Sequence, residues 1–180
     1  MAAGEEKASI AYWLMPNAVA RDFLVATVRD LAARFDAPIF EPHLTIHVTP
    51  KSDNDPTAVL IRAAESCHPL SLSIVNLRFS DKFTKTVFVQ FTLTPLLINL
   101  SRAIQKASAV AENTYELDPH LSLIYKKMTE REKTDIINSI QLPFRDVLFD
   151  RLQAVNCRFS TESGTDVERW RVVATHELSQ

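Results

Sequence analysis

The sequence predicts a fold of mixed α and β structure with two pseudo-symmetric lobes, in which equivalent strands face each other across a central cleft. Three observations lead to this prediction. Strand-like and helix-like segments follow one another in the same order in both halves of the 180-residue chain. The third element of each half carries a similar pentapeptide, PHLTI at 42–46 and PHLSL at 119–123. Equivalent positions in the first strands also lie 33 residues before the histidines, from Ile10 to His43 and from Val87 to His120.

Apolar periodicity and helix caps define the individual elements. Four helix starts carry side chains that can accept hydrogen bonds from the first free amides of a helix, namely Asn17, Asp55, Thr94 and Thr129. The first half is expected to form a strand at 10–14, a helix at 17–34, a strand at 43–49, a helix at 55–67 and a strand at 70–79. The second half is expected to form a strand at 86–93, a helix at 94–112, a strand at 120–125, a helix at 129–140, and two final strands at 152–160 and 167–175 around a turn at 162–165.

The length suits one domain over residues 1–180, with lobes at roughly 1–80 and 81–180 and the C-terminal strands completing the sheets. Two glycines cannot build a P-loop or a GxGxxG turn, so any bound phosphate must be held by side chains or ordinary backbone amides. The formal net charge of −2 gives no basic surface for a long nucleic acid. No leader or apolar membrane span is recognisable, and we expect a cytoplasmic monomer. Cys67 and Cys157 lack metal-binding spacing and are expected to be free thiols, with a disulfide as the alternative.

Each pentapeptide places an imidazole and a hydroxyl on one face of a strand. Side chains at i and i+2 share a face, so His43 points with Thr45, and His120 points with Ser122. The apolar residues between and after them point to the other face, into a core. If the two halves pack about a pseudo-two-fold axis, both histidines face the same cleft.

Two imidazoles and two hydroxyls suit a displacement at phosphorus. One histidine can take a proton from the attacking oxygen while the other gives one to the leaving oxygen, because the ordinary histidine pKa of about 6.5 allows both roles near neutral pH. The hydroxyls can donate hydrogen bonds to the non-bridging phosphate oxygens. This chemistry needs no metal ion, and no cofactor is expected. A single His-x-Thr on a strand is more often structural, whereas two copies at equivalent positions favour catalysis.

Two further positions are candidates for substrate contacts. His47 is expected on the same strand face as His43 and Thr45, where it is a structural histidine at the strand end, a substrate contact or a metal ligand. No carboxylates at metal-binding spacing accompany it. In the connection between the halves, Phe83 either belongs to a solvated loop or borders the cleft and stacks on a base.

The paired H-x-[T/S] strands resemble those of the two-histidine phosphoesterase superfamily, which includes the 2′,5′ RNA ligase-like proteins, and in particular its cyclic phosphodiesterase family. Further matching stretches cover most of the chain: YWLMP at 12–16, PHLT at 42–45, PHLSLIY at 119–125, MTEREK at 128–133 and ERW at 168–170. The matches at Trp13 and Tyr125 favour the cyclic phosphodiesterase branch. The chain departs from plant relatives at His47, where an apolar or small residue is expected, and in its smaller set of cysteines, so regulation through disulfides is not expected.

The resemblance implies a bilobal α+β fold, in which antiparallel β-sheets line a central cleft and helices lie outside. It also implies metal-independent hydrolysis of small cyclic phosphates, such as ADP-ribose 1″,2″-cyclic phosphate or nucleoside 2′,3′-cyclic phosphates, to phosphomonoesters. It makes His43 and His120 the acid–base pair, the hydroxyls of the two motifs the phosphate ligands, and Tyr125 and Trp13 candidate pocket residues. In this assignment His120 activates water and His43 protonates the leaving oxygen.

Two other functions are weighed against this one. An RNA-end phosphodiesterase of the 2′,5′ ligase type would act on longer substrates, and the neutral-to-acidic charge argues against it. A non-catalytic nucleotide- or RNA-binding module would not need both motifs intact. The expected partner is therefore a small cyclic phosphate or nucleotide, with RNA ends as the alternative and no membrane.

Overall fold

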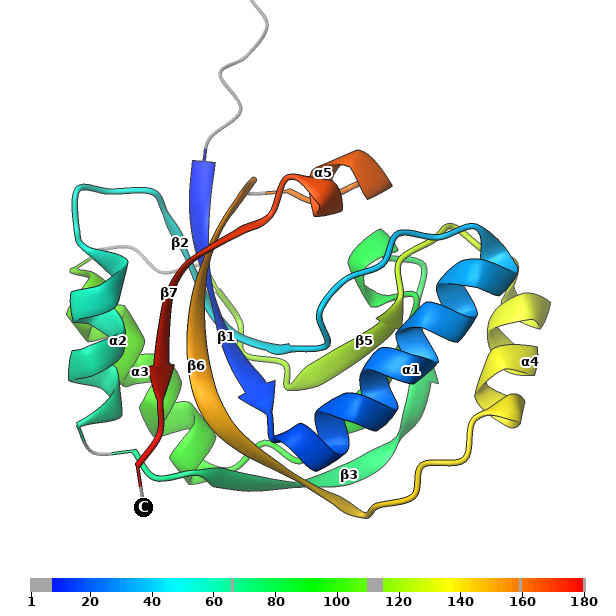
Figure 1. Cartoon of the computed structure of the whole chain (residues 1–180), viewed down its shortest axis with the longest axis horizontal. Coiled ribbons are helices and arrows are strands. Elements are labelled where there is room, and N and C mark those ends of the chain that lie inside the picture. Colours follow the sequence, from blue (N-terminus) through cyan, green and yellow to red (C-terminus); the bar gives the residue numbers. More distant parts are fainter. Residues whose placement is uncertain (1–7, 66, 110–114, 159, 180) are drawn as a thin grey trace, which may run out of the picture.

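The computed structural model describes residues 8–65, 67–109, 115–158 and 160–179 (Figure 1). The strands are β1 (Ala8–Pro16), β2 (Leu44–Pro50), β3 (Leu70–Phe79), β4 (Val87–Phe91), β5 (His120–Ile124), β6 (Asp146–Arg158) and β7 (Arg171–Glu177). The helices are α1 (Ala18–Phe35), α2 (Pro56–Ala64), α3 (Pro95–Ser108), α4 (Glu130–Ser139) and α5 (Gly164–Glu168), with a 3-10 turn η1 (Phe83–Lys85). The predicted order of strands and helices in both halves is confirmed as far as β6.

All strand pairings are antiparallel, and they form one seven-stranded sheet in the order β1-β2-β5-β4-β3-β6-β7. The long strand β6 closes this sheet on itself, because its first residues pair with β3 and the rest of it pairs with both β1 and β7. The predicted α+β class with antiparallel strands is confirmed. The strands form one continuous sheet, however, rather than a separate sheet in each lobe.

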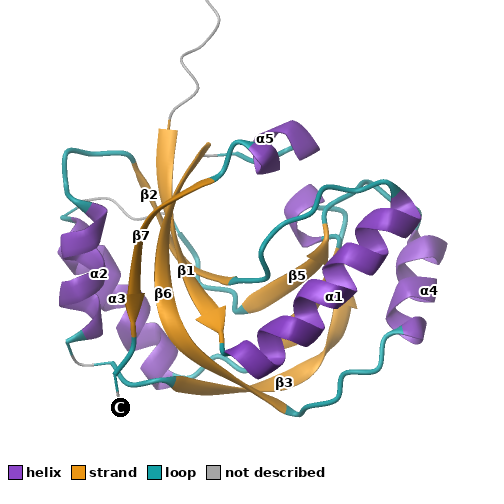
Figure 2. Cartoon of the chain, in the orientation of Figure 1, coloured by secondary structure: helices purple, strands orange, loops and turns teal. Residues whose placement is uncertain are grey.

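The two halves of the chain are interleaved. Strand β3 pairs with β4 across the midpoint of the sequence, and the late strand β6 pairs with β1. The helices cross over as well, since α1 packs on β5 and α3 packs on β2. The sheet curves around a concave side, with α2 and α3 outside it at one end and α1 and α4 outside it at the other (Figure 2). The division into lobes near residue 80 stays a prediction.

The four predicted helix caps are present. The side chains of Asn17, Asp55 and Thr94 accept hydrogen bonds from the first-turn amides of α1, α2 and α3, and Thr129 with Glu132 forms a capping box at the start of α4. The core lies between the sheet and the helices, where the apolar residues of both pentapeptides are completely buried. Within the described part of the chain, no helix is long and apolar enough to cross a bilayer.

The C-terminal region differs from the expectation of two strands around a turn. Strand β6 starts at Asp146, earlier than predicted, because its first residues pair with β3. Helix α5 occupies the predicted turn, and β7 starts only at Arg171. The Ser163 hydroxyl accepts from the Asp166 amide while the Asp166 carboxylate accepts from the Ser163 amide, so a capping box stabilises this short helix. Gly164 is its first residue rather than a turn glycine.

Candidate active site

The two pentapeptides meet at the centre of the sheet. Strands β2 and β5 pair at Leu44 and Leu121, the middle residues of the two motifs. Continuing this antiparallel register by one residue on either side places the histidine of each motif opposite the hydroxyl-bearing residue of the other. Both leucines are fully buried in the core, so the histidines and hydroxyls face the concave side of the sheet.

Most of the predicted site residues line one cavity of about 220 Å³ on this concave side. His43, which directly precedes β2 rather than lying within it, contributes together with Thr45, and His120 contributes from the start of β5. Trp13 and Tyr125 line it as well, whereas the predicted residues Ser122, His47 and Phe83 are not among its described lining residues. The cavity is also lined by residues that the sequence analysis did not single out for the site: Thr84, Tyr115, Cys157, Arg158, Thr161 and Trp170.

Both histidines are held in the same tautomer. The Nδ1 atom of His43 lies 2.6 Å from the carbonyl oxygen of Glu41, and Nδ1 of His120 lies 2.7 Å from the carbonyl oxygen of Asp118. A carbonyl only accepts hydrogen bonds, so each Nδ1 carries the proton. The Nε2 atom of each neutral ring is therefore the basic nitrogen.

Burial lowers the pKa of both histidines. His43 is 7% exposed, and its pKa falls to about 3, mainly through burial; the bond to Glu41 acts upward and the nearby His120 acts downward. Burial is also the main cause of the lowered pKa of His120, with the Lys85 charge acting in the same direction. Both rings are thus neutral near pH 7 in the ligand-free protein. A phosphate anion between them would favour a protonated ring.

An ion pair stands behind each histidine. Glu41 pairs with Arg21 of α1, and Asp118 pairs with Lys85 of η1. The Asp118 carboxylate also accepts a hydrogen bond of 3.1 Å from Gln90 Nε2. Each motif thus begins with an acidic residue whose carbonyl fixes the histidine and whose carboxylate is held by a cation. The sequence analysis missed this role, although the acidic residue two positions before each histidine was a visible signal.

Trp13 contacts His43 directly. Its indole ring stacks on the His43 ring, with centroids 3.6 Å apart and an angle of 11° between the planes. Trp170 packs edge-on against both rings, at 5.2 Å from Trp13 and 5.7 Å from His43. A cation over the face of an indole is stabilised by the ring quadrupole. The stack therefore favours the protonated form of His43 and opposes the effect of burial.

Tyr125 forms another part of the cavity wall. It is 3% exposed and stacks on Phe40 with centroids 3.8 Å apart, while Phe83 packs at 6.0 Å. Burial raises the pKa of Tyr125, with the Ser122 side chain acting in the other direction, so the phenol keeps its proton and can donate a hydrogen bond. Phe83 supports this wall from behind and is not among the described residues that line the cavity.

The two motif hydroxyls are placed differently. Thr45 lines the cavity, and its backbone carbonyl accepts a hydrogen bond of 2.8 Å from the Tyr115 hydroxyl. Ser122 is almost fully buried and donates a 2.7 Å hydrogen bond to the carbonyl of Thr84. Among the described residues it is not part of the cavity lining. Through this hydrogen bond, Ser122 stabilises the turn η1 before β4.

The expectation that His47 shares a face with His43 and Thr45 is wrong. A β-bulge in β2 sets Thr45 opposite Trp13 but His47 opposite Tyr12, which are consecutive residues of β1. One extra residue in β2 shifts the alternation, so His47 points away from the cavity into the core. It is 1% exposed, and burial lowers its pKa to about 4. Among the described residues, no group of three or more His, Cys, Asp or Glu side chains is placed to hold a metal ion.

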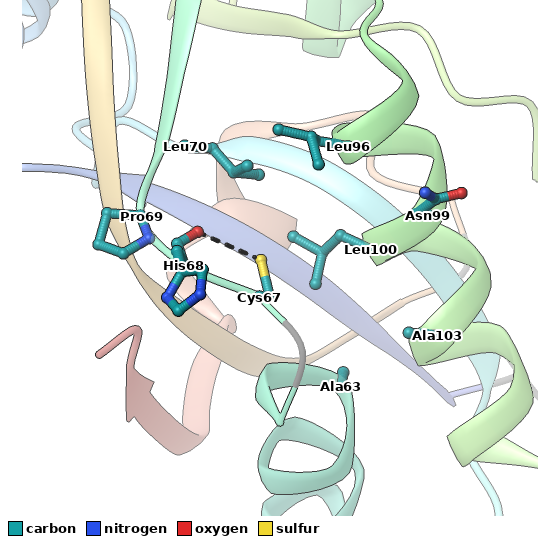
Figure 3. Close-up of a pocket in the computed structure, with 9 residues that line it drawn as sticks. All are labelled: Ala63, Cys67, His68, Pro69, Leu70, Leu96, Asn99, Leu100 and Ala103. Carbon is teal, nitrogen blue, oxygen red and sulfur yellow. Dashed lines mark hydrogen bonds between the residues drawn. The ribbon is translucent and has the colours of Figure 1, made fainter. Parts of the chain in front are cut away.

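A second cavity, of about 320 Å³, lies on the outer side of the sheet between α2, α3 and the start of β3 (Figure 3). Cys67 faces it and donates a 3.4 Å hydrogen bond to the carbonyl of His68. Cys157 instead lines the cavity that holds the histidines. Both cysteines are free, so the alternative of a disulfide between them is wrong.

Comparisons with known proteins identify the family and the fold of the chain. Residues 8–178 match the model of the family described as "Cyclic phosphodiesterase-like protein". A cyclic phosphodiesterase of Arabidopsis thaliana is 22% identical over 171 residues, which cover 93% of each chain. Among solved structures, LigT of E. coli in complex with 3′-AMP is 15% identical, with a TM-score of 0.59 over 97% of this chain and 100% of that chain. A protein of Thermus thermophilus, TT0787, is 14% identical, with a TM-score of 0.61 over 94% and 97%.

These matches confirm the predicted fold and the resemblance on which the phosphodiesterase prediction rests. The family match extends over all seven strands and both pentapeptides. The chain therefore belongs to the cyclic phosphodiesterase-like family.

Proposed function

We propose that this phosphodiesterase opens small cyclic phosphates, such as ADP-ribose 1″,2″-cyclic phosphate or nucleoside 2′,3′-cyclic phosphates, to phosphomonoesters without a metal ion. One observation carries the proposal. Two imidazoles line one cavity, and each has its Nδ1 fixed by a carbonyl so that its Nε2 is the basic nitrogen. This is the arrangement that one base and one acid need for in-line displacement at phosphorus.

In the proposed reaction, His120 Nε2 takes a proton from water as the water oxygen attacks phosphorus. The bond from phosphorus to the ring oxygen on the opposite side breaks, and protonated His43 gives its proton to that oxygen. The Thr45 hydroxyl and the Tyr125 phenol can donate hydrogen bonds to the non-bridging oxygens as charge accumulates there. The product is a phosphomonoester with one free hydroxyl. The reaction leaves His120 protonated and His43 neutral, and exchange with solvent restores both.

The neighbours of the two rings support this division of roles, whereas burial, which lowers the pKa of His43 to about 3, opposes it and must be offset by the bound phosphate. The Trp13 face stacked on His43 favours an imidazolium, which is the form a general acid needs. The Lys85 charge near His120 favours a neutral imidazole, which is the form a general base needs. The near-symmetry of the motifs is thus broken by different neighbours.

The size of the substrate is inferred from the cavity and from the relatives. A cavity of about 220 Å³ has room for a cyclic phosphate with its sugar rather than for a folded RNA. LigT has been solved in complexes with 3′-AMP, ATP and NADP+, and the Arabidopsis relative is named a cyclic phosphodiesterase. These names support a small nucleotide as the substrate. We further propose that the protein works as a cytoplasmic monomer.

The test is hydrolysis of 2′,3′-cyclic AMP in the presence of EDTA, with the product identified by phosphorus NMR. His43→Ala and His120→Ala are each expected to lower kcat at least ~10²-fold, the usual scale of one acid or base. His68→Ala is the matched control, because His68 lies beside the other cavity. Full activity in either catalytic variant contradicts the two-histidine mechanism, and loss of activity with EDTA contradicts metal independence.

A further inference from the structure

Among the described residues that line the cavity of the two histidines, one side chain is permanently charged. Arg158, the last residue of β6, lines it, and among the described lining residues no other carries a charge that persists at all ordinary pH values. No aspartate or glutamate of the described chain lines the cavity. In the proposed reaction, one phosphate lies between the two histidines. This phosphate does not explain why a guanidinium also lines the cavity.

Arg158 and the histidines lie at opposite ends of the cavity along the strand direction. On β1, Trp13 lies at the level of His43, whereas Ala8 pairs with Arg158. These two positions on β1 are about 17 Å apart at about 3.4 Å per residue, and the long arginine side chain covers part of this distance because it reaches the same cavity.

The residues that line the cavity between these two ends have short side chains. Ala11 of β1 pairs with Val48 of β2, and Cys157 of β6 follows toward Arg158. Small residues at these positions leave room above the strands for a sugar ring. A ligand with its cyclic phosphate between the histidines would then extend toward the guanidinium.

The Arg158 guanidinium is oriented by a contact with α5. Its Nη1 lies 3.0 Å from Asp166 Oδ1. The other oxygen of that carboxylate accepts hydrogen bonds from the Glu162 amide, the Ser163 amide and the Ser163 hydroxyl, at 3.1, 3.1 and 2.7 Å. Asp166 therefore shares its charge between the guanidinium and the start of α5. An arginine oriented in this way suits recognition of a phosphate, because its planar fork matches the geometry of phosphate oxygens.

We propose that Arg158 forms a second anion subsite, which binds a phosphate on the far side of the sugar from the cyclic phosphate. The inference rests on the proposed function and narrows its substrate class. The preferred substrates are cyclic phosphates that carry another phosphate group, as on the 5′ carbon of a nucleoside, rather than unphosphorylated cyclic nucleosides.

Two substrates that differ in one phosphate test the subsite. The protein hydrolyses 2′,3′-cyclic AMP and its 5′-phosphorylated derivative, and kcat/KM is measured for both in the same preparations. The wild type is expected to prefer the 5′-phosphorylated substrate by about tenfold, the scale of a charge-assisted hydrogen bond at a partly exposed site. Arg158→Gln is expected to remove this preference. Because the two substrates are compared within one variant, a general loss of active protein does not affect the ratio.

Two control variants separate the charge from the packing of α5. Arg158→Lys keeps a cation and is expected to retain part of the preference. Asp166→Asn loosens the contact that orients the guanidinium but keeps the cation, so the preference is expected to fall without disappearing. An unchanged preference in Arg158→Gln, or no preference in the wild type, overturns the subsite and leaves the proposed function intact.

A binding experiment keeps the two proposals distinguishable. Adenosine 2′,5′-bisphosphate and 2′-AMP are titrated into wild type and Arg158→Gln in a calorimeter. Binding of the bisphosphate that is at least about fivefold tighter, and that depends on Arg158, supports the subsite even if neither cyclic nucleotide is hydrolysed, in which case only the proposed function fails. Equal affinity of the wild type for both ligands overturns the subsite.

Discussion

The ion pair behind His120 provides a charge-neutralisation test of the proposal that His120 is the base. The Lys85 ammonium lies 4.5 Å from the Phe88 ring centre, and that ring lies 5.5 Å from the His120 ring, so the charge is at most about 10 Å from the imidazole. A unit charge at about 10 Å and an effective dielectric constant of about 20 interacts by about 1.7 kcal/mol, which is about one pKa unit. Lys85→Met removes this charge and leaves Asp118 unpaired. Both changes raise the pKa of His120.

The direction of the pH effect follows from the role of His120. A base must be neutral to act, so a raised pKa moves the acid limb of the kcat/KM profile about one pH unit upward and leaves the rate near pH 8 almost unchanged. Asp118→Asn has the opposite effect, because it leaves the Lys85 charge uncompensated and moves the acid limb downward. The backbone carbonyl that holds His120 Nδ1 is present in both variants.

The assay is kcat/KM for 2′,3′-cyclic AMP from pH 4.5 to 9 at low ionic strength, with a repeat at high salt to screen the charges. Arg21→Met is the matched control, because it breaks the equivalent ion pair behind His43 and should leave the limb assigned to His120 in place. If the Lys85 and Asp118 variants move the acid limb in the same direction, or if neither moves it, the assignment of His120 as the base is refuted.

Three further predictions concern stability and the second motif. The folded-state pKa of His47 is about 4, against about 6.5 in the unfolded chain. Its contribution to the free energy of unfolding is therefore complete above pH 6.5 and is lost as the pH falls toward 4, by up to about 3 kcal/mol. In urea unfolding at pH 5 and 7, the free energy of unfolding of His47→Phe should depend less on pH than that of the wild type, and an equal pH dependence contradicts this. Leu121→Ala leaves a core cavity and should lower the free energy of unfolding by about 2–5 kcal/mol, measured by urea titration, whereas a loss below about 1 kcal/mol is contrary to full burial. Ser122→Ala removes the bond to the Thr84 carbonyl and should lower kcat/KM about tenfold or more without moving either pH limb; unchanged kcat/KM argues against any role of this hydroxyl in catalysis.

The sequence was sufficient for those parts of the fold that depend on local patterns. The helix caps and the order of strands and helices rest on residues close together in the chain, and so does the sharing of a face by His43 and Thr45. The reversal of His47 depends on a bulge, which exists only relative to the partner strand β1. Tyr115 and Arg158 reach the cavity because β5 and β6 are placed by distant pairings. Helix α5 had a local signal in Ser163 and Asp166, but Gly164 between them also favours a turn.

The interleaving of the two halves has a consequence for how the enzyme can be divided. Helix α1 covers the strand that carries His120, and α3 covers the strand that follows His43, so each half supplies the outer layer of the other. A fragment cut within the connection between β3 and β4 would expose the apolar face of its own histidine-motif strand. Each fragment therefore needs the other in order to fold, as the subunits of an obligate heterodimer do, and the connection between β3 and β4 joins the two covalently. The chain should accept a break in that link as long as both pieces are present, and activity should appear only when they associate.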